Sequence, residues 1–354
     1  MKRAAIITIT NSGMNFGNRI QNYALQTVLE GHSVCVETIY SAKGIKKSIL
    51  LSTLRRLFKT IIKTSKRRRH FNSFEGKYIK KAKRVRYERI NDHYFKNKYD
   101  AFIAGSDQVW NPTFGFNSEF EFMTFAEPAK RYSYAASFGV GEIPEEHRQA
   151  FAERLSQLQA ISVREDKGKD IVKRLTNREA KVHIDPTMLL TAGHYSKIEE
   201  KPKSPIPDQY LLSYFLGQQK AEHRAFIEQV AQKQNLAVLE LSELADSALY
   251  HVGPQHFLYL LRHAEYICTD SFHGTIFSIL FHKQFTVFYR YNKDVPMNSR
   301  VETLLEKMEI ENRLFGELTI EASLEDIPYH HVDRLLEKER QDADEYLRAI
   351  IERW

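Results

Sequence analysis

A histidine stands where an apolar run gives way to a helix-forming segment, in the sequence Thr269-Asp270-Ser271-Phe272-His273-Gly274-Thr275. Asp270 and Ser271 are natural helix N-caps, so His273 falls in the first helical turn. Gly274 allows a ligand to approach the backbone, and the N–H groups of a helix N-terminus attract anions. An imidazole in this position can exchange a proton with an anionic substrate. The alternative is a structural histidine.

Two further segments carry groups that can bind a sugar. Ser106, Asp107, Gln108 and Trp110 follow a strand-like run in the sequence Gly105-Ser106-Asp107-Gln108-Val109-Trp110-Asn111-Pro112. Asp and Gln side chains bind hydroxyls, and a Trp face can stack on a sugar ring; the alternative is a turn with a buried tryptophan. Gly17 and Asn18 follow the first strand-like run and open a helix. They match neither a dinucleotide-binding motif nor a P-loop, and the alternative there is an ordinary tight turn.

Arg164 lies in Ser162-Val163-Arg164-Glu165-Asp166, where another strand-like run enters a helix. A guanidinium at a strand end can bind a carboxylate or a phosphate through two parallel hydrogen bonds. The alternative is a salt bridge with Glu165 or Asp166. No histidine, cysteine or carboxylate spacing is typical of a metal site, so we expect neither a metal nor a cofactor.

Strand-like and helix-like patterns alternate along the chain, which is typical of parallel sheets covered on both faces. Ligands of such sheets bind beyond the carboxyl ends of the strands, where all four segments lie. The expected strands are 4–10, 34–39, 99–104, 132–137, 160–163, 181–184, 210–216, 237–241, 265–268 and 285–289. The expected helices are 20–30, 145–158, 167–175, 222–234, 255–263, 271–282 and 324–353.

The stretch Lys201–Asp208 holds three prolines within six residues and reads as a linker. We therefore predict an α/β protein with two Rossmann-like domains facing across a cleft. The N-terminal domain covers 1–200 and contains a basic helical insertion at 43–86. The C-terminal domain covers 201–323, and a helix at 324–354 packs back on the protein.

The net charge of +7 is very uneven, because residues 43–86 hold 17 Lys and Arg against one acid, Glu75. A basic amphipathic helix can lie on an anionic membrane, at roughly 1 kcal/mol per basic residue. A solvated flap is an equal alternative. Nucleic-acid binding is disfavoured because no nucleic-acid-binding motif accompanies the segment.

The chain has two cysteines, Cys35 and Cys268, and no run of about 18 apolar residues that could span a membrane. The first apolar run meets Asn11 rather than a small-residue cleavage site, so it reads as a strand and not as a signal peptide. Low cysteine usage is typical of a reducing compartment. We expect a cytoplasmic protein, with the basic segment as a candidate contact with the inner face of the plasma membrane.

The order of these motifs resembles the polysaccharide pyruvyl transferase family. The matching pieces are Gly17-Asn18, Gly105–Pro112, Tyr134–Gly139, Ser162–Glu165, His183–Thr187 and Val252-Gly253-Pro254 through Thr269–Ser278. They extend over nearly the whole chain and are specific only together. The resemblance implies a glycosyltransferase B-like fold and transfer of a pyruvyl group from phosphoenolpyruvate.

The resemblance also implies site roles. His273 is the implied general acid, in the C-terminal, donor-side domain. Arg164 occupies the place of an arginine that binds the donor's anionic groups. The family's Arg-Leu-His motif reads Ser271-Phe272-His273 here, so its arginine is absent. Arg290, Arg300 and the helix N-terminus with Ser271, Gly274 and Thr275 are the candidates to replace it. The acceptor-side residues are Gly17, Asn18, Ser106, Asp107, Gln108 and Trp110.

The predicted function is ketal formation on sugar hydroxyls during cell-surface polysaccharide biosynthesis, with phosphoenolpyruvate as co-substrate and a lipid-linked oligosaccharide as acceptor. The missing arginine keeps a second function open, a glycosyltransferase of the same fold that uses a nucleotide sugar. A third is a non-catalytic, membrane-associated scaffold of polysaccharide assembly.

Overall fold

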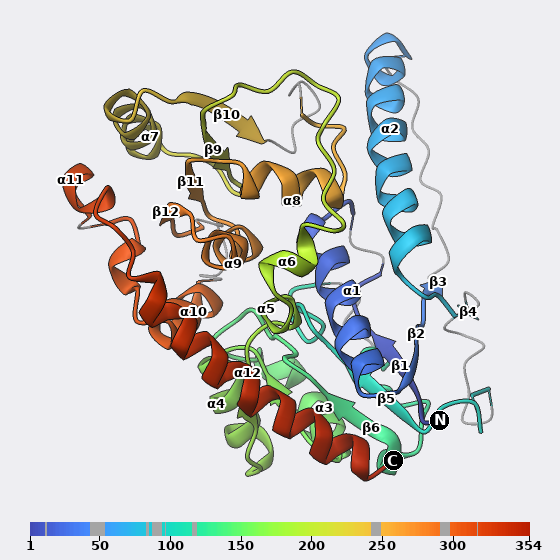
Figure 1. Ribbon diagram of the computed structural model, residues 1–354. Coiled ribbons are helices and arrows are strands. Elements are labelled where there is room, and N and C mark those ends of the chain that lie inside the picture. The colour runs from blue at the N-terminus through green and yellow to red at the C-terminus, as the bar shows by residue number, and fades with distance from the viewer. Residues whose placement is uncertain are drawn as a thin grey trace. The chain divides into compact units, whose positions relative to one another are not determined.

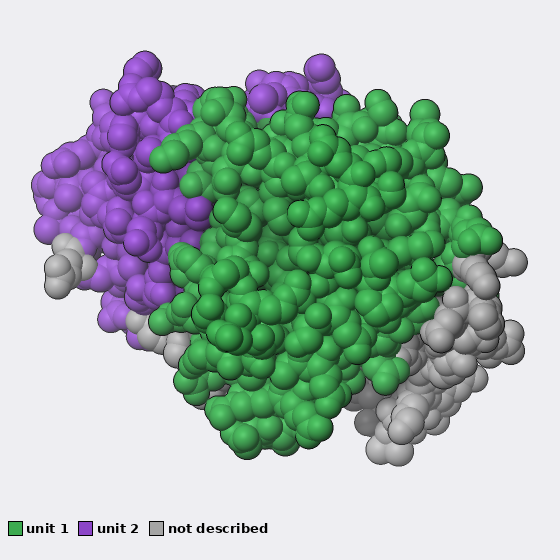
Figure 2. Space-filling view, turned by 90° about the horizontal axis from the view of Figure 1, so that it is seen from below, with its two compact units in different colours: residues 1–47, 75–190, 336–354 green, residues 48–74, 191–335 purple. Residues whose placement is uncertain are grey.

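The computed structural model describes residues 1–10, 13–42, 54–82, 85–86, 94–95, 97–114, 119–241, 249–290, 298–316 and 318–354, with backbone alone for 41–42, 54–65 and 85–86. The chain forms two compact units, coloured separately in Figure 2. Unit 1 comprises residues 1–47, 75–190 and 336–354, and unit 2 comprises residues 48–74 and 191–335.

Unit 1 is built on a parallel sheet with strand order β2-β1-β5-β6. Parallel bridges from Tyr132 to Ala160 and from Ala136 to Val163 continue this sheet to β7 and β8. Strand β5 is buried along its whole length, as its apolar sequence predicts for a sheet covered on both faces. The strands are β1 (Arg3–Ile7), β2 (Cys35–Thr38), β5 (Ala101–Ala104), β6 (Arg131–Ser133), β7 (Ser162–Val163) and β8 (Lys181–Val182), beside a separate pair, β3 (Ser41–Ala42) and β4 (Val85–Arg86).

Helices cover this sheet, and two of them begin at side-chain caps. Asn15 caps α1 by accepting a hydrogen bond from the backbone N–H of Asn18 (3.0 Å), and Asp185 caps α5. The helices of unit 1 are α1 (Phe16–Gly31), α3 (Glu145–Ser156), α4 (Asp166–Thr176), α5 (Pro186–Leu189) and a 3₁₀ turn, η2 (Pro128–Lys130).

The last helix, α12 (Tyr329–Glu352, red in Figure 1), belongs to unit 2 as far as Leu335 and to unit 1 from Leu336 on. Ala343, Leu347 and Ile350 are buried in one cluster with apolar residues of β1, β2 and β5. The phenol of Tyr346 donates to the carbonyl oxygen of Ser133 (2.8 Å). This packing confirms the prediction that the C-terminal helix returns to the protein.

Unit 2 is built on a second parallel sheet, with strand order β10-β9-β11-β12. Its core includes Leu211, Val230, Cys268 and Phe288. The strands are β9 (Tyr210–Tyr214), β10 (Ala237–Leu241), β11 (Tyr266–Thr269) and β12 (Gln284–Val287). The helices are α6 (Ala192–Tyr195), α7 (Ala221–Lys233), α8 (Pro254–Arg262), α9 (Phe272–Leu280), α10 (Ser299–Lys307), η3 (Glu311–Arg313) and α11 (Ile320–Ser323), together with α2 (Leu54–Tyr78) as far as Phe74.

In each of the two four-stranded sheets, the second strand along the chain lies on one side of the first strand, and the next strand lies on its other side. In unit 1, β2 and β5 lie on opposite sides of β1, and in unit 2, β10 and β11 lie on opposite sides of β9. At such a switch point, the loops that follow the two neighbouring strands lead away from each other, which opens a crevice beyond the carboxyl ends of these strands. The candidate residues that follow β5 and β11 are therefore at the expected binding edges.

Two parallel sheets with alternating helices confirm the predicted α/β class. The change of unit falls between Leu190 and Thr191, and the predicted linker Lys201–Asp208 lies inside unit 2. Of the basic insertion at 43–86, residues 54–78 form the single helix α2, and 43–53 lie outside the described residues.

Three imidazoles hold the C-terminal part of α2 in unit 2. The ring centroid of His70 lies 4.8 Å from that of His256 and 6.5 Å from that of His251. The backbone N–H of Gly253 donates to Nδ1 of His256 (2.9 Å). The pKa of His256 is lowered to about 4, chiefly by burial and also by the neighbouring His70, while Glu200 opposes the shift. Burial also lowers the pKa of His70.

Acid is expected to destabilise this cluster. The unfolded chain protonates His256 near its ordinary pKa of 6.5, whereas the folded protein does so only near 4. The free energy of unfolding should therefore fall as the pH drops from 6.5 toward 4. Denaturant midpoints of the parent protein and of His256→Gln, measured at neutral pH and near the lower limit of this window, test this. An equal loss of stability in both proteins would exclude His256 as the cause.

The core position of α12 gives a second prediction. Leu347→Ala should lower the free energy of unfolding by about 2–5 kcal/mol, because it leaves a cavity in the core of unit 1. Its neighbour Arg348 is exposed and, within the described part of the chain, forms an ion pair only with Asp344 of the same helix. Arg348→Ala is therefore the matched control, with a change of about 0.5 kcal/mol or less. Similar losses in the two variants would refute the packing role of Leu347.

Candidate active site

The turn after β5 carries the first group of candidate residues. Gly105 (φ 131°) and Asp107 (φ 70°) both have positive φ, and the peptide bond between Gly105 and Ser106 is cis. A Cβ at position 105 would lie 2.1 Å from the carbonyl oxygen of Tyr134, so the turn requires glycine. The backbone N–H of Ser106 donates to Oε1 of Gln21 (3.0 Å), which ties the turn to α1.

A buried ion pair lies beneath this turn. Nη1 of Arg164 lies 2.6 Å from Oδ2 of Asp185, and both side chains are at most 1% exposed. Oδ1 of Asp185 accepts from the backbone N–H (3.0 Å) and the hydroxyl (2.7 Å) of Thr187, while Oγ of Ser106 lies 3.0 Å from Oδ2. A buried ion pair needs such additional hydrogen bonds to offset its desolvation. The pair joins the ends of β5, β7 and β8.

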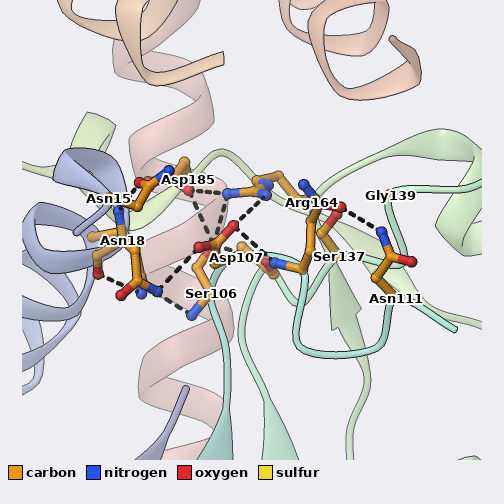
Figure 3. Close-up of polar contacts among 12 residues, drawn as sticks. Asn15, Asn18, Ser106, Asp107, Asn111, Ser137, Gly139, Arg164 and Asp185 are labelled. Atoms are coloured by element: carbon orange, nitrogen blue, oxygen red, sulfur yellow. Dashed lines mark hydrogen bonds and ion pairs between the residues drawn. The ribbon is translucent and has the colours of Figure 1, made fainter. Parts of the chain in front are cut away.

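Asp107 lies between Arg164 and α1 (Figure 3). Its Oδ1 is 3.6 Å from Nη2 of Arg164 and accepts from the backbone N–H of Gln108 (2.9 Å). Its Oδ2 accepts from Nδ2 of Asn18 (3.1 Å). The structure thus brings together Asn18, Ser106, Asp107 and Arg164, which are far apart in the sequence.

Glu165 holds the loop that follows β6. Its Oε1 accepts from the hydroxyl of Ser137 (3.0 Å) and from the backbone N–H groups of Phe138 (2.9 Å) and Gly139 (3.2 Å). The side chain is fully buried. The sequence left a salt bridge with Glu165 or Asp166 as the alternative for Arg164, and the structure pairs Arg164 with Asp185 at 2.6 Å.

The predicted sugar stacking of Trp110 does not fit its position. The indole is fully buried and lies parallel to the ring of Phe122, with centroids 5.3 Å apart. Gln108 is also largely buried, and its Oε1 accepts from Nδ2 of Asn111 (2.5 Å). Gly17 is buried in the first turn of α1. The apolar neighbours of the Trp110 indole favour core packing, the alternative that the sequence left open.

In unit 2, Asp270 organises the edge of the sheet beyond β9 and β11. Its two carboxylate oxygens accept from the backbone N–H groups of Leu216 and Gly217, each at 2.7 Å. Nε of Arg290 lies 3.5 Å from Oδ2 of Asp270, and Nη2 donates to its carbonyl oxygen (3.1 Å). Asp270 therefore links the loop after β9 to Arg290, which lies three residues beyond the end of β12.

The helix α9 begins as the sequence predicts. Ser271 is the N-cap, and its Oγ accepts from the backbone N–H of Gly274 (3.2 Å). The hydroxyl of Thr275 donates to the carbonyl oxygen of Ser271 (3.1 Å). A Cβ on Gly274 would lie 2.6 Å from Oγ1 of Thr269, so this position requires a glycine. The turn places His273 directly beyond β11.

His273 is 7% exposed and packs edge-on against Phe272, with ring centroids 5.5 Å apart. The guanidinium of Arg300, from α10, lies 5.5 Å from the centroid of Phe272 on the ring face. Arg290 is joined to the same turn through Asp270. The structure thus gathers His273 and two arginines around the first turn of α9, where the sequence could only name them as candidates.

Asp185 and Glu165 were missed as site residues, although both lie in the motifs. The pattern Asp185-Pro186-Thr187 is a recognisable helix start, because an N-cap aspartate precedes proline at the first helical position. No local sequence pattern predicts that Asp185 pairs with Arg164, because Arg164 lies 21 residues earlier in the chain.

Among the described residues, no three His, Cys, Asp or Glu side chains come together as a metal site requires. None of the helices in the described part of the chain is long and apolar enough to cross a membrane.

Known structures share this fold. The Staphylococcus aureus MnaA structure with UDP is 13% identical, with a TM-score of 0.50, and the match covers 97% of this chain and 90% of that one. The UDP-N-acetylglucosamine 2-epimerase from Rickettsia bellii is 10% identical, with a TM-score of 0.50, and the match covers 99% and 96%. At these identities the likeness concerns the fold alone, and it defines a glycosyltransferase B-type α/β protein. No curated protein sequence matches the chain significantly.

The family follows from the sequence motifs that occupy this fold. The model of the polysaccharide pyruvyl transferase family matches residues 15–291, which include both sheet edges described above. The chain belongs to the polysaccharide pyruvyl transferase family and is a transferase of polysaccharide biosynthesis.

The buried ion pair of unit 1 gives a third prediction. Asp185→Asn should lower the free energy of unfolding by about 3–5 kcal/mol, because it leaves the guanidinium of Arg164 buried without its carboxylate. The control is Glu142→Gln, which removes the exposed ion pair with Arg174 and should cost at most about 1 kcal/mol. Denaturant unfolding of both variants measures the difference, and equal costs would show that burial of the pair is unimportant.

Proposed function

We propose that this enzyme transfers a pyruvyl group from phosphoenolpyruvate to two hydroxyls of a sugar in a cell-surface polysaccharide or its lipid-linked precursor. The observation that carries the proposal is His273 in the first turn of α9, with Arg290 and Arg300 beside that turn. An imidazole can supply the proton, and arginines can bind the two anionic groups of the donor.

In the proposed reaction, protonated His273 donates its proton to the methylene carbon of phosphoenolpyruvate. The oxygen of one sugar hydroxyl then bonds to the adjacent, cationic carbon and loses its proton. The oxygen of a second hydroxyl displaces phosphate at the same carbon and closes the ketal ring, and the departing phosphate takes the proton of that hydroxyl. General-acid assistance of this kind accelerates a reaction roughly 10²–10⁴-fold.

The donor needs cationic partners because it carries a carboxylate and a phosphate. The family's arginine is replaced by Ser271, whose hydroxyl caps α9 instead. We assign its part to Arg290 and Arg300, with the N-terminus of α9 as a further anion-binding group. Ser271, Gly274 and Thr275 set the shape of this turn through the contacts described above.

The acceptor is assigned to the edge of unit 1 that holds Gly17, Asn18, Ser106, Asp107 and Gln108. Side-chain amides and carboxylates are the groups that bind sugar hydroxyls. Arg164 is assigned to the donor by family resemblance alone, and its buried pairing with Asp185 favours a different role.

A nucleotide-sugar-dependent glycosyltransferase is the second candidate function. Two observations favour it: the similar fold of the MnaA structure, which contains UDP, and the serine at the position of the family's arginine. Thermal-shift measurements separate the candidates. Stabilisation by phosphoenolpyruvate and not by UDP or GDP sugars supports pyruvyl transfer, and the reverse supports glycosyl transfer.

We place the reaction in the cytoplasm, at the inner face of the plasma membrane. Lys66, Arg68 and Arg69 are exposed on α2 and can contact anionic lipid. Arg67 has a structural role, because its Nη1 donates to the carbonyl oxygen of Tyr250 (2.9 Å). Binding to anionic vesicles without turnover on any donor would instead favour a non-catalytic scaffold.

The fourth prediction tests the general acid. His273→Ala should lower turnover about 10²–10⁴-fold, because the proton donor is lost, while phosphoenolpyruvate still binds. Phosphate release from phosphoenolpyruvate with a panel of lipid-linked sugar acceptors measures turnover, and calorimetry measures donor binding. His282→Ala is the control, since His282 is exposed beyond the other end of α9 and pairs with Asp333. Unchanged turnover in His273→Ala would remove the assignment.

A further inference from the structure

Two carboxylates, Asp185 and Asp107, face Arg164, and a third, Glu165, follows it in the chain; the three differ in access to solvent. The side chains of Asp185 and Glu165 are fully buried. The side chain of Asp107 is 15% exposed. A group that acts on a substrate must touch it, so Asp107 is the carboxylate of these three that a ligand can reach.

Asp107 is held in a fixed orientation. Its backbone has a φ of 70°, a strained region for a non-glycine residue that costs of order 1–3 kcal/mol and must be enforced by its surroundings. The carbonyl oxygen of Asp107 accepts from the backbone N–H groups of Val109 (2.8 Å) and Ser137 (3.0 Å), which enforces this conformation. Strain of this kind is common where a side chain must be presented to a ligand.

The carboxylate itself is fixed from both sides (Figure 3). Asn18 donates to Oδ2 of Asp107, and Asn18 is oriented in turn because its own Oδ1 accepts from Nη1 of Arg19 (2.6 Å). Nε of Arg19 lies 2.8 Å from Oε1 of Glu75, so the arginine that orients Asn18 is itself held by an ion pair. Nη2 of Arg164 lies 3.6 Å from Oδ1 of Asp107.

The charges at this edge suit hydroxyls better than anions. The guanidinium of Arg164 faces two carboxylates, Asp185 at 2.6 Å and Asp107 at 3.6 Å. Arg164 is 3% exposed and lies behind them, whereas Asp107 is the member that meets solvent. A phosphate or carboxylate arriving here would meet a like charge first, which is unfavourable, whereas a neutral hydroxyl can donate a hydrogen bond to Asp107.

We propose that Asp107 accepts the proton of the attacking sugar hydroxyl, and that Arg164 is a positioning residue that holds Asp107 through the buried pair with Asp185. This inference rests on the proposed function and refines it. As the hydroxyl oxygen bonds to the cationic carbon of the donor, its O–H bond breaks and the proton passes to Oδ of Asp107. Asp107 then releases the proton to water. When the oxygen of the second hydroxyl bonds to the same carbon, the bond from that carbon to the phosphate oxygen breaks, and the departing phosphate takes the proton of that hydroxyl.

The fifth prediction compares acceptor chemistry with donor binding. Asp107→Asn keeps the size of the side chain and removes the base, so kcat should fall about 10²–10⁴-fold. The dissociation constant of phosphoenolpyruvate, measured by calorimetry without acceptor, should stay within about twofold. The acidic limb of the pH–rate profile should disappear. Asp100→Asn is the matched control, because Asp100 sits at the opposite end of β5 and, among the described residues, its side chain accepts a hydrogen bond only from the backbone N–H of Arg3.

Arg164→Lys tests the positioning role, because lysine keeps the charge but loses the planar guanidinium that spans two carboxylates. Its kcat should fall while the dissociation constant of phosphoenolpyruvate is unchanged, with folding checked by circular dichroism. A folded Arg164→Lys protein that binds phosphoenolpyruvate about tenfold more weakly would place Arg164 on the donor and overturn the inference. So would an Asp107→Asn enzyme with unchanged turnover and pH profile.

A separate measurement keeps this inference distinct from the choice of donor. Saturation-transfer NMR with methyl glycosides of glucose, galactose, mannose and N-acetylglucosamine reports sugar binding without any donor. Loss of the signal in Asp107→Asn, but not in Asp100→Asn, supports Asp107 as a sugar contact even if the parent enzyme fails to bind phosphoenolpyruvate. Retention of the full signal in Asp107→Asn overturns that contact.

Discussion

The buried pair between Arg164 and Asp185 is the interaction on which the functional edge of unit 1 depends. It joins the ends of three strands and leaves Asp107 at the surface with one carboxylate oxygen facing the guanidinium. An unpaired ion in this interior would be strongly unfavourable, so the two charges can be kept only while the strand ends stay together. Stability and site geometry in unit 1 are thus consequences of the same contact.

Unit 2 reaches a similar result with different chemistry. Asp270 accepts two backbone N–H groups from the loop after β9 and faces Arg290 from beyond β12. In each unit a carboxylate fixes loops at the point where strand addition reverses, and the residues assigned to the ligand lie next to it. In unit 1 the arginine is buried beneath the edge. In unit 2 Arg290 retains some exposure, which suits the assignment of anionic ligands to this unit.

Much of the fold could be predicted from sequence, because parallel strands buried on both faces leave apolar runs and each run is followed by helix-start residues. The same local logic located His273, since Ser271 and Gly274 mark the start of α9. Long-range packing could not be read in this way. The sequence leaves Trp110 open as a sugar-stacking or a core residue, and only the folded chain places Phe122 against its indole. The pairing of Arg164 with Asp185 likewise has no local signal in the sequence.

The way the two units are divided along the chain affects how the protein folds while it is being synthesised. Unit 1 takes its residues from three separate stretches, and its core includes Leu347 and Ile350 of α12. The strands made first at the ribosome therefore stay without their final partner helix until residues 336–354 have emerged. During that interval, apolar surface on β1 and β5 is open to chaperones, and a protein cut short before α12 would keep that surface exposed.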